Sequence, residues 1–197
     1  VAERKMGSLS QPLWCSIGNM WPNFANPLMK DKRVLQAINL SQDRQEFGKI
    51  RYGGRYLATT FYPVDTVWGK PSDQVWNVVP GFGTGAKKVA EREQAKQLLA
   101  DAGYPNGIPD LELLTGYTEG SVEAMQRGLL SVGINARINF QADTEQRWGK
   151  GNFVLLDRRL CLALGDPDEV MANYFIPGGP RNLGRYDHRR AGQRHAQ

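Results

Sequence analysis

Histidine and cysteine are scarce in this sequence. Its 197 residues include two histidines, His188 and His195, both in the C-terminal segment, and two cysteines, Cys15 and Cys161. No Ser/His/Asp or Cys/His arrangement can therefore be built on the predicted core, and a metal site would have to use carboxylates and thiols without a short ligand spacing. We expect a protein that is not an enzyme, with no catalytic residue, no bound metal and no cofactor.

Long hydrophobic runs are also missing. The longest cover residues 153–156 and 160–164, far short of the roughly 20 residues of a membrane-spanning helix. With 41% hydrophobic and 23% charged residues, the composition is that of a folded domain and excludes a wholly disordered chain. Two cysteines form at most one bridge, and since both lie in predicted strands we favour two small buried side chains over a disulfide.

Positive charge is concentrated near the C-terminus. The formal net charge is +5, and the segment from residue 180 onward contains one acid, Asp187, beside Arg181, Arg185, Arg189, Arg190 and Arg194. The rest of the chain is therefore nearly neutral. Arginines beside an aromatic residue also occur in arms that bind nucleic acid. We interpret residues 188–197 as a basic polar tail and expect no nucleic-acid partner.

Hydrophobic periodicity predicts an α/β domain in which helices and strands alternate. The expected helices span residues 31–40, 43–50, 87–102, 121–132, 144–150 and 166–175, and the expected strands span 13–19, 111–115, 134–140 and 152–164. The clearest helix is the third. Its expected buried side is Val89, Ala95, Leu98, Leu99 and Ala102, and its expected solvent side includes Glu91, Arg92, Glu93 and Lys96.

No periodicity is visible between residues 51 and 86. This segment mixes glycines and prolines with seven aromatic residues, which favours a meander packed by its own side chains. Within it, residues 81–86 read GFGTGA and match the G-x-G-x-x-G/A pattern of dinucleotide-binding loops. Pro80 interrupts the strand that such a loop requires, and Thr115-Gly116 ends the next strand without an acid. We keep a nucleotide-binding α/β enzyme that uses residues 81–88 as the alternative hypothesis.

Two groups of charges accompany the last predicted strand. Asp157, Arg158 and Arg159 interrupt an otherwise apolar run, which requires a sheet edge, a bulge or a polar cleft. A cleft and an exposed edge remain equally good explanations at this point. Asp166 and Asp168 follow the strand, where capping of the next helix is favoured over a role as ligands.

Four sequence blocks resemble the family 5 extracellular solute-binding proteins, the peptide, nickel and oligosaccharide receptors of ABC importers. Residues 27–39, PLMKDKRVLQAIN, are similar to the family pattern P-P-F-x-D-x-R-V-R-Q-A-I-N, although Leu35 stands where an arginine is usual. Residues 95–107, AKQLLADAGYPNG, resemble A-K-x-L-L-x-x-A-G-Y-x-x-G. Residues 129–134 resemble L-x-x-x-G-I, and residues 164–168 resemble the family's Asp-Pro-Asp segment.

The resemblance implies a type II periplasmic-binding-protein fold, with a mixed sheet flanked by helices. It covers about residues 25–185, so we expect residues 1–187 to form part of one lobe of a two-lobed receptor whose second lobe is missing here. It further implies capture of a peptide-like or other small polar solute between the lobes and delivery to a membrane permease. The expected location is the periplasm, or the outer surface with a membrane tether in a Gram-positive source.

Ligands of open α/β sheets bind beyond the carboxyl ends of the strands. Side chains in the loops at these ends are therefore the first candidates for contacts with a solute. Peptide-binding members of the family often carry an aspartate three positions before Asp-Pro, which pairs with the peptide's amino group. This chain has Ala163 at that position and so lacks this charge partner. The candidate ligand-binding residues are Trp21, Thr115, Tyr117, Arg159, Ala163 and Asn182.

Overall fold

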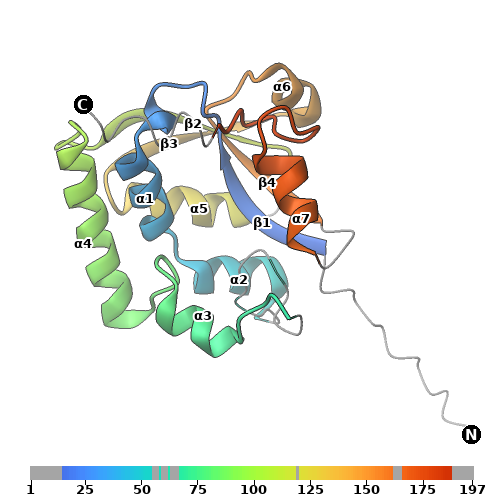
Figure 1. Cartoon of the computed structure of the whole chain (residues 1–197). Coiled ribbons are helices and arrows are strands. Elements are labelled where there is room, and N and C mark those ends of the chain that lie inside the picture. The colour runs from blue at the N-terminus through green and yellow to red at the C-terminus, as the bar shows by residue number, and fades with distance from the viewer. Residues whose placement is uncertain are drawn as a thin grey trace, which may run out of the picture.

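A four-stranded mixed sheet forms the centre of the computed structural model (Figure 1), which describes residues 15–54, 58, 62, 67–118, 120–161 and 166–187. Its strands, in the order β1-β4-β2-β3, are β1 (Cys15–Pro22), β4 (Leu155–Cys161), β2 (Ile108–Thr115) and β3 (Ile134–Phe140). Strand β2 pairs in parallel with β3 and β4, whereas β1 pairs antiparallel with β4. This arrangement confirms the predicted mixed sheet.

Helices cover both faces of the sheet. The helical elements are η1 (Leu28–Lys30), α1 (Lys32–Ser41), α2 (Arg44–Tyr52), α3 (Ser72–Val78), α4 (Gly85–Asp101), α5 (Ser121–Leu130), α6 (Thr144–Lys150), α7 (Pro167–Val170) and the π-helix η2 (Met171–Phe175). Figure 1 shows α1, α4 and α5 on one side of the sheet and α6 and α7 on the other. No helix among these described residues is long and apolar enough to span a membrane.

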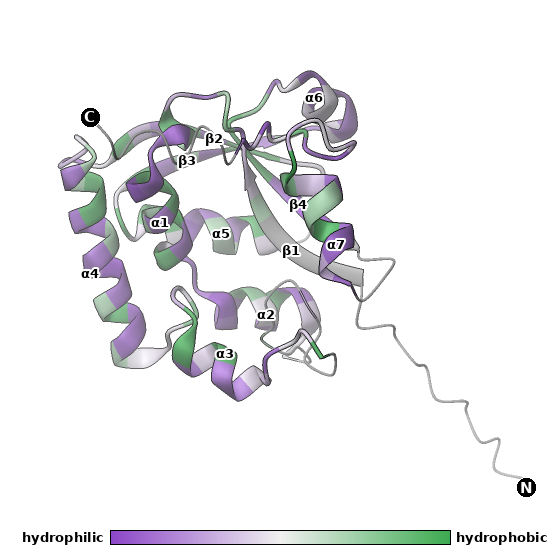
Figure 2. Ribbon diagram, viewed as in Figure 1, coloured by the Kyte–Doolittle hydropathy of each residue, from purple (hydrophilic) through white to green (hydrophobic). Residues whose placement is uncertain are grey.

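Two hydrophobic clusters follow from the alternation of side chains along the strands. Leu113 and Leu155 are paired neighbours in β2 and β4 and belong to the larger cluster, beneath α1, α4 and α5. The next pair, Leu114 and Leu156, belongs to the second cluster, with Trp148 of α6 and residues of α7 and η2. In Figure 2 green and purple alternate along α4 and α5, so each of these helices carries both hydrophobic and hydrophilic residues.

The starts of α1, α2 and α7 agree with the sequence-based predictions, because an aspartate caps each of these helices. The Asp31 carboxylate accepts a hydrogen bond from the Arg33 N–H, and the Asp43 carboxylate accepts one from Glu46. Asp166 accepts from the N–H of Asp168 at 2.9 Å, which confirms the predicted cap of α7. These side chains satisfy N–H groups that a helix terminus leaves without partners.

The segment 51–86 differs from the predicted meander. It contains the helix α3, which begins after Pro71 and buries Val75 completely, and α4 begins at Gly85 instead of residue 87. Helix α3 is too short to show a helical hydrophobic period, and Val75 is the one buried residue among its seven.

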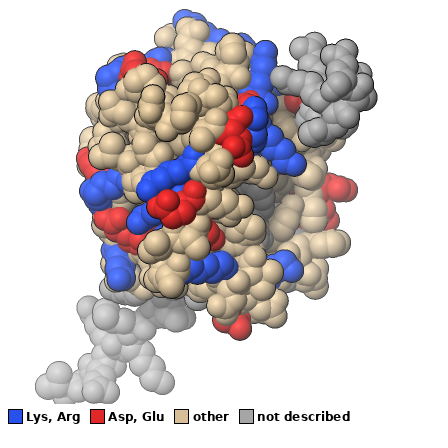
Figure 3. All heavy atoms as spheres, turned by 90° about the vertical axis from the view of Figure 1, so that its left-hand side faces the viewer, with Lys and Arg blue, Asp and Glu red and all other residues tan. Residues whose placement is uncertain are grey.

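The buried side of α4 also differs from the prediction. Ala95 and Leu99 are buried as expected, but Val89 is 60% exposed, while Lys88 and Glu91 are 5% and 6% exposed. The first turns of the helix are therefore rotated with respect to the expected apolar stripe. Figure 3, which views the molecule from the side of α4, shows positive and negative side chains interspersed over the outer surface.

Candidate functional site

The carboxyl ends of the parallel strands meet at one edge of the sheet. Pairing between β2 and β4 stops at Thr115 and Asp157, and beyond this point β4 continues only beside β1. Residues 158–161 therefore extend past β2 as part of a two-stranded ribbon. This edge is where ligands of open α/β sheets are expected.

A buried hydroxyl–carboxylate pair lies at this edge. The Thr115 hydroxyl donates to the Asp157 carboxylate at 3.0 Å, and the two residues are 0% and 5% exposed. The same threonine oxygen accepts the backbone N–H of Tyr117 at 3.0 Å. A buried carboxylate requires such partners because burial without them is costly. These bonds fix both the end of β2 and the start of the loop that follows it.

Two arginines extend from β4 next to this pair. The Arg159 guanidinium carbon lies 3.9 Å from the ring centroid of Tyr117. The Arg158 guanidinium lies at the same distance from the ring of Trp148 and forms an ion pair with Glu145. Asp157 lies between paired strands and is not at a sheet edge, whereas Arg158 and Arg159 lie where β4 is paired with β1 alone, so within the described sheet the edge explanation holds for the two arginines.

A second candidate site is an aromatic pocket of about 160 Å³ beside the end of β1. Its walls include Trp21, Phe24, Tyr174, Phe175 and Tyr186. The Trp21 ring centroid is 5.3 Å from that of Tyr174, and the indole N–H is buried without a hydrogen-bond partner. The pocket is therefore mainly apolar.

Asn182 also lines this pocket, but its polar groups hold the surrounding loop. Its amide nitrogen donates to the backbone oxygens of Ile176 and Tyr186, and its oxygen accepts the N–H of Tyr186 at 2.8 Å. The hydrogen bonds explain this asparagine as a structural residue of the loop.

The predicted site residues thus fall into two groups. Thr115, Tyr117 and Arg159 come together at the strand ends, whereas Trp21 and Asn182 line the aromatic pocket. Trp21 pairs with Leu156, one position before Asp157, so the tryptophan and the aspartate side chains lie on opposite faces of the sheet. Ala163 lies outside the described residues. Asp157 was missed as a site residue, although a carboxylate within an apolar strand is the signal that points to it.

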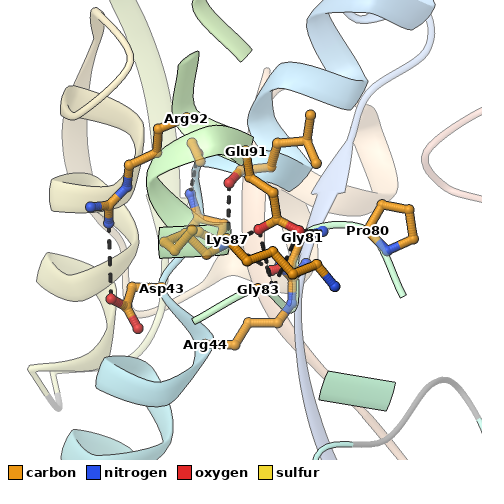
Figure 4. Close-up of polar contacts among 12 residues, drawn as sticks. Asp43, Arg44, Pro80, Gly81, Gly83, Lys87, Glu91 and Arg92 are labelled. Atoms are coloured by element: carbon orange, nitrogen blue, oxygen red, sulfur yellow. Dashed lines mark hydrogen bonds and ion pairs between the residues drawn. The ribbon is translucent and has the colours of Figure 1, made fainter. Parts of the chain in front are cut away.

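The glycine loop at residues 81–86 is bound by the protein's own carboxylate (Figure 4). Glu91 accepts the backbone N–H of Gly81 at 2.8 Å and that of Gly83 at 3.1 Å. These N–H groups are the donors that a bound phosphate would need. The observed contacts therefore favour a structural loop over a nucleotide site. The ring of Phe82 packs against that of Trp76, in agreement with the aromatic packing predicted for this segment.

Two cations complete this network. Lys88 Nζ lies 2.6 Å from the Glu91 carboxylate and donates to the Gly81 carbonyl at 2.9 Å. Arg44 donates to the Gly81 and Asn39 carbonyls and stacks over the ring of Phe82. Burial lowers the pKa of Lys88, and the bond to Glu91 only partly offsets this effect. Figure 4 shows that the network joins α2, α4 and the loop.

The sequence profile of the bacterial extracellular solute-binding proteins, family 5 Middle, matches residues 14–182. The chain belongs to this family. A comparison with curated proteins finds no significant match for this solute-binding protein.

Solved structures show the same fold. The solute-binding protein aligns with HbpA2 from Haemophilus parasuis with a TM-score of 0.71 and 22% identity, over 88% of this chain and 34% of that one. NikA from Staphylococcus aureus, in complex with Ni(L-His)₂, aligns with a TM-score of 0.68 and 21% identity, over 90% of this chain and 37% of NikA. DppA from Helicobacter pylori, in complex with the peptide STSA, aligns with a TM-score of 0.65 and 21% identity, over 88% of this chain and 33% of DppA. The chain therefore spans about a third of the length of these proteins.

Proposed function

We propose that this chain forms one lobe of the substrate-binding component of an ABC importer. The solute would bind in a cleft between this lobe and a second lobe, and closure of the lobes would present it to a membrane permease. The observation that carries this proposal is the family membership, together with the polar residues at the carboxyl edge of the sheet. The role is binding and delivery, without catalysis.

The strand-end residues suit a small polar or peptide-like solute. Arg159 supplies guanidinium donors for a carboxylate or carbonyl group, and Tyr117 supplies a flat ring beside it. Asp157 is held by Thr115, so the negative charge has a fixed position. Known structures of relatives contain a peptide in one case and a nickel–histidine complex in another, and both ligands carry carboxylates and amines.

The proposed location follows from the same role. A receptor that delivers solutes to an importer works outside the inner membrane, so we infer the periplasm, or the outer cell surface with a membrane tether in a Gram-positive cell. The partners are then the permease and the second lobe of the receptor.

Arg159→Ala in the complete receptor is expected to weaken solute binding by about ten- to a hundredfold, because a charge-assisted hydrogen bond contributes roughly 1.5–3 kcal/mol. Solutes are first found by thermal shift with short peptides and with nickel–histidine, and affinities are then measured by calorimetry. The matched control is Arg158→Ala on the same strand, whose guanidinium lies over Trp148 instead. Equal losses in both variants, or no solute that raises the melting temperature, would contradict the proposal.

A further inference from the structure

The aromatic pocket beside the end of β1 is separate from the strand-end residues proposed to contact the solute. Trp21, which forms part of its wall, is paired with Leu156, one position before Asp157. The side chains of Trp21 and Asp157 therefore lie on opposite faces of the sheet. We propose that this pocket binds a second ligand, a small aromatic acid with one planar ring and a carboxylate. The proposal does not depend on which solute binds at the strand ends.

Aromatic rings in mutual contact form a continuous wall of the pocket. The ring centroid of Trp21 lies 5.3 Å from that of Tyr174 and 6.2 Å from that of Phe175. Tyr186 continues the series, with centroid distances of 5.8 Å to Phe175 and 5.1 Å to Phe24. The planes of Trp21 and Phe175 differ by 24°, whereas Tyr186 meets Phe175 at 85°. A further ring that enters the pocket can therefore make both stacked and edge-to-face contacts.

The volume of the pocket suits a single ring. It measures about 160 Å³, and an apolar protein cavity of about 150 Å³ is large enough to bind benzene. Because the walls are mainly aromatic, water inside the pocket finds few hydrogen-bond partners, and its displacement by an apolar ring is favourable. The size and the lining thus point to the same part of a ligand, an unsaturated six-membered ring.

Backbone contacts fix the shape of the pocket. The N–H of Phe24 donates to the carbonyl of Gly184 at 2.8 Å, which fastens the loop 181–186 to the segment that follows β1. Gly184 approaches β1 so closely that a Cβ atom there would lie 2.9 Å from the carbonyl oxygen of Pro22. Together with the hydrogen bonds of Asn182, these contacts position the rings before a ligand arrives. Such preorganisation reduces the entropic cost of binding.

Arg181 gives the pocket its preference for an anion. Among the described residues that line the pocket it is the one with a charge, and it is exposed to solvent. The charge of Glu169 also acts on Arg181, but the side-chain hydrogen bond that the described structure contains goes to the Tyr174 hydroxyl, at 3.0 Å. This bond uses one of the five N–H donors of a guanidinium. The other donors suit a carboxylate, because charge-assisted hydrogen bonds are the strongest.

The test is a titration of the full, isotope-labelled chain with phenylacetate, followed by nuclear magnetic resonance. Trp21 forms part of the wall, so its indole N–H signal should shift and saturate as the ligand binds. The signal is assigned by its loss in the variant Trp21→Phe. We expect a Kd of about 1 mM or lower, as for a well-fitted ligand of this size. The absence of a saturable shift of this signal up to about 10 mM phenylacetate would overturn the proposal.

Two arginine variants and a neutral probe separate the ring from the charge. Arg181→Met should weaken phenylacetate binding by about tenfold, but change the binding of benzyl alcohol, which has the same ring and no charge, by less than about twofold. The matched control is Arg185→Met in the same loop, because the Arg185 guanidinium donates to the Lys150 carbonyl at 3.1 Å and does not line the pocket. Equal losses of phenylacetate binding in the two variants would contradict the proposal. Benzyl alcohol that binds the unaltered chain as tightly as phenylacetate would also contradict it.

Discussion

Replacing Glu91 by glutamine is expected to lower the free energy of unfolding by about 3–5 kcal/mol, because it leaves buried cations without their counter-charge. Glu91 is 6% exposed, and its carboxylate receives Lys88 at 2.6 Å as well as two backbone N–H groups of the glycine loop. Arg44 is also buried in this network and feels the same negative charge. Glutamine keeps the size of the side chain but removes the charge.

The chain contains a matched control for this prediction. Glu93 lies two positions further along α4. Its carboxylate forms an ion pair with Lys96 at 2.7 Å, but its side chain is 64% exposed. Exposed pairs of this kind contribute about 0.3–0.5 kcal/mol, so Glu93→Gln should be nearly neutral. The measurement is chemical denaturation followed by circular dichroism. Losses that agree within about 1 kcal/mol for the two variants would mean that the buried network adds little to stability.

Gly107→Ala is expected to destabilise the domain by about 3 kcal/mol or more, since it combines a steric overlap with an unfavourable backbone conformation. Gly107 has φ +80°, and a Cβ atom there would overlap the carbonyl oxygen of Gly133 and lie 2.8 Å from its carbonyl carbon. That oxygen also accepts the Ile108 N–H at 3.0 Å. Both glycines directly precede paired strands, because Ile108 lies beside Ile134. The overlap therefore involves backbone atoms, which cannot move without disturbing the ladder.

Gly103→Ala separates the two contributions. Gly103 has φ +94°, but a Cβ atom there would have no neighbour within 4 Å, so this variant carries only the backbone penalty of about 1–2 kcal/mol. Thermal and urea unfolding of both variants should therefore show a clearly larger loss for Gly107→Ala. A loss at Gly107 no greater than that at Gly103 would rule out a tight contact between the two strand starts.

The elements that could be predicted were those with a strong local signal. The spacing of Val34, Ile38 and Leu40 in α1 and of Val122, Met125 and Leu129 in α5 identified buried sides that the structure confirms. Helix α3 could not be found in this way, because its seven residues bury only Val75. The rotation of α4 could not be predicted from the sequence either. Lys88 and Glu91 are charged and therefore look like solvent-facing residues, and their partners, Arg44 and the glycine loop, reach them only through the tertiary fold.

The candidate site was only partly accessible to sequence analysis for a similar reason. The rule that ligands bind beyond strand ends led to Thr115, Tyr117 and Arg159, and these residues do gather there. Trp21 satisfied the same rule from the sequence, but β1 runs antiparallel to its neighbour, and the Trp21 side chain lies on the face of the sheet opposite to that of Asp157. Strand direction depends on long-range pairing, which no local pattern of residues reveals.

The strand order has a consequence for how the domain is assembled during synthesis. Strand β1 leaves the ribosome before the other strands, yet its neighbour in the described sheet is β4, the last strand to be made. Strands β2 and β3, by contrast, are joined through α5 and can pair soon after they appear. Strand β1 therefore stays without its β4 partner until nearly the whole described domain has been synthesised. Closing so large a loop slows folding, and until β4 pairs with it β1 exposes an unpaired strand edge.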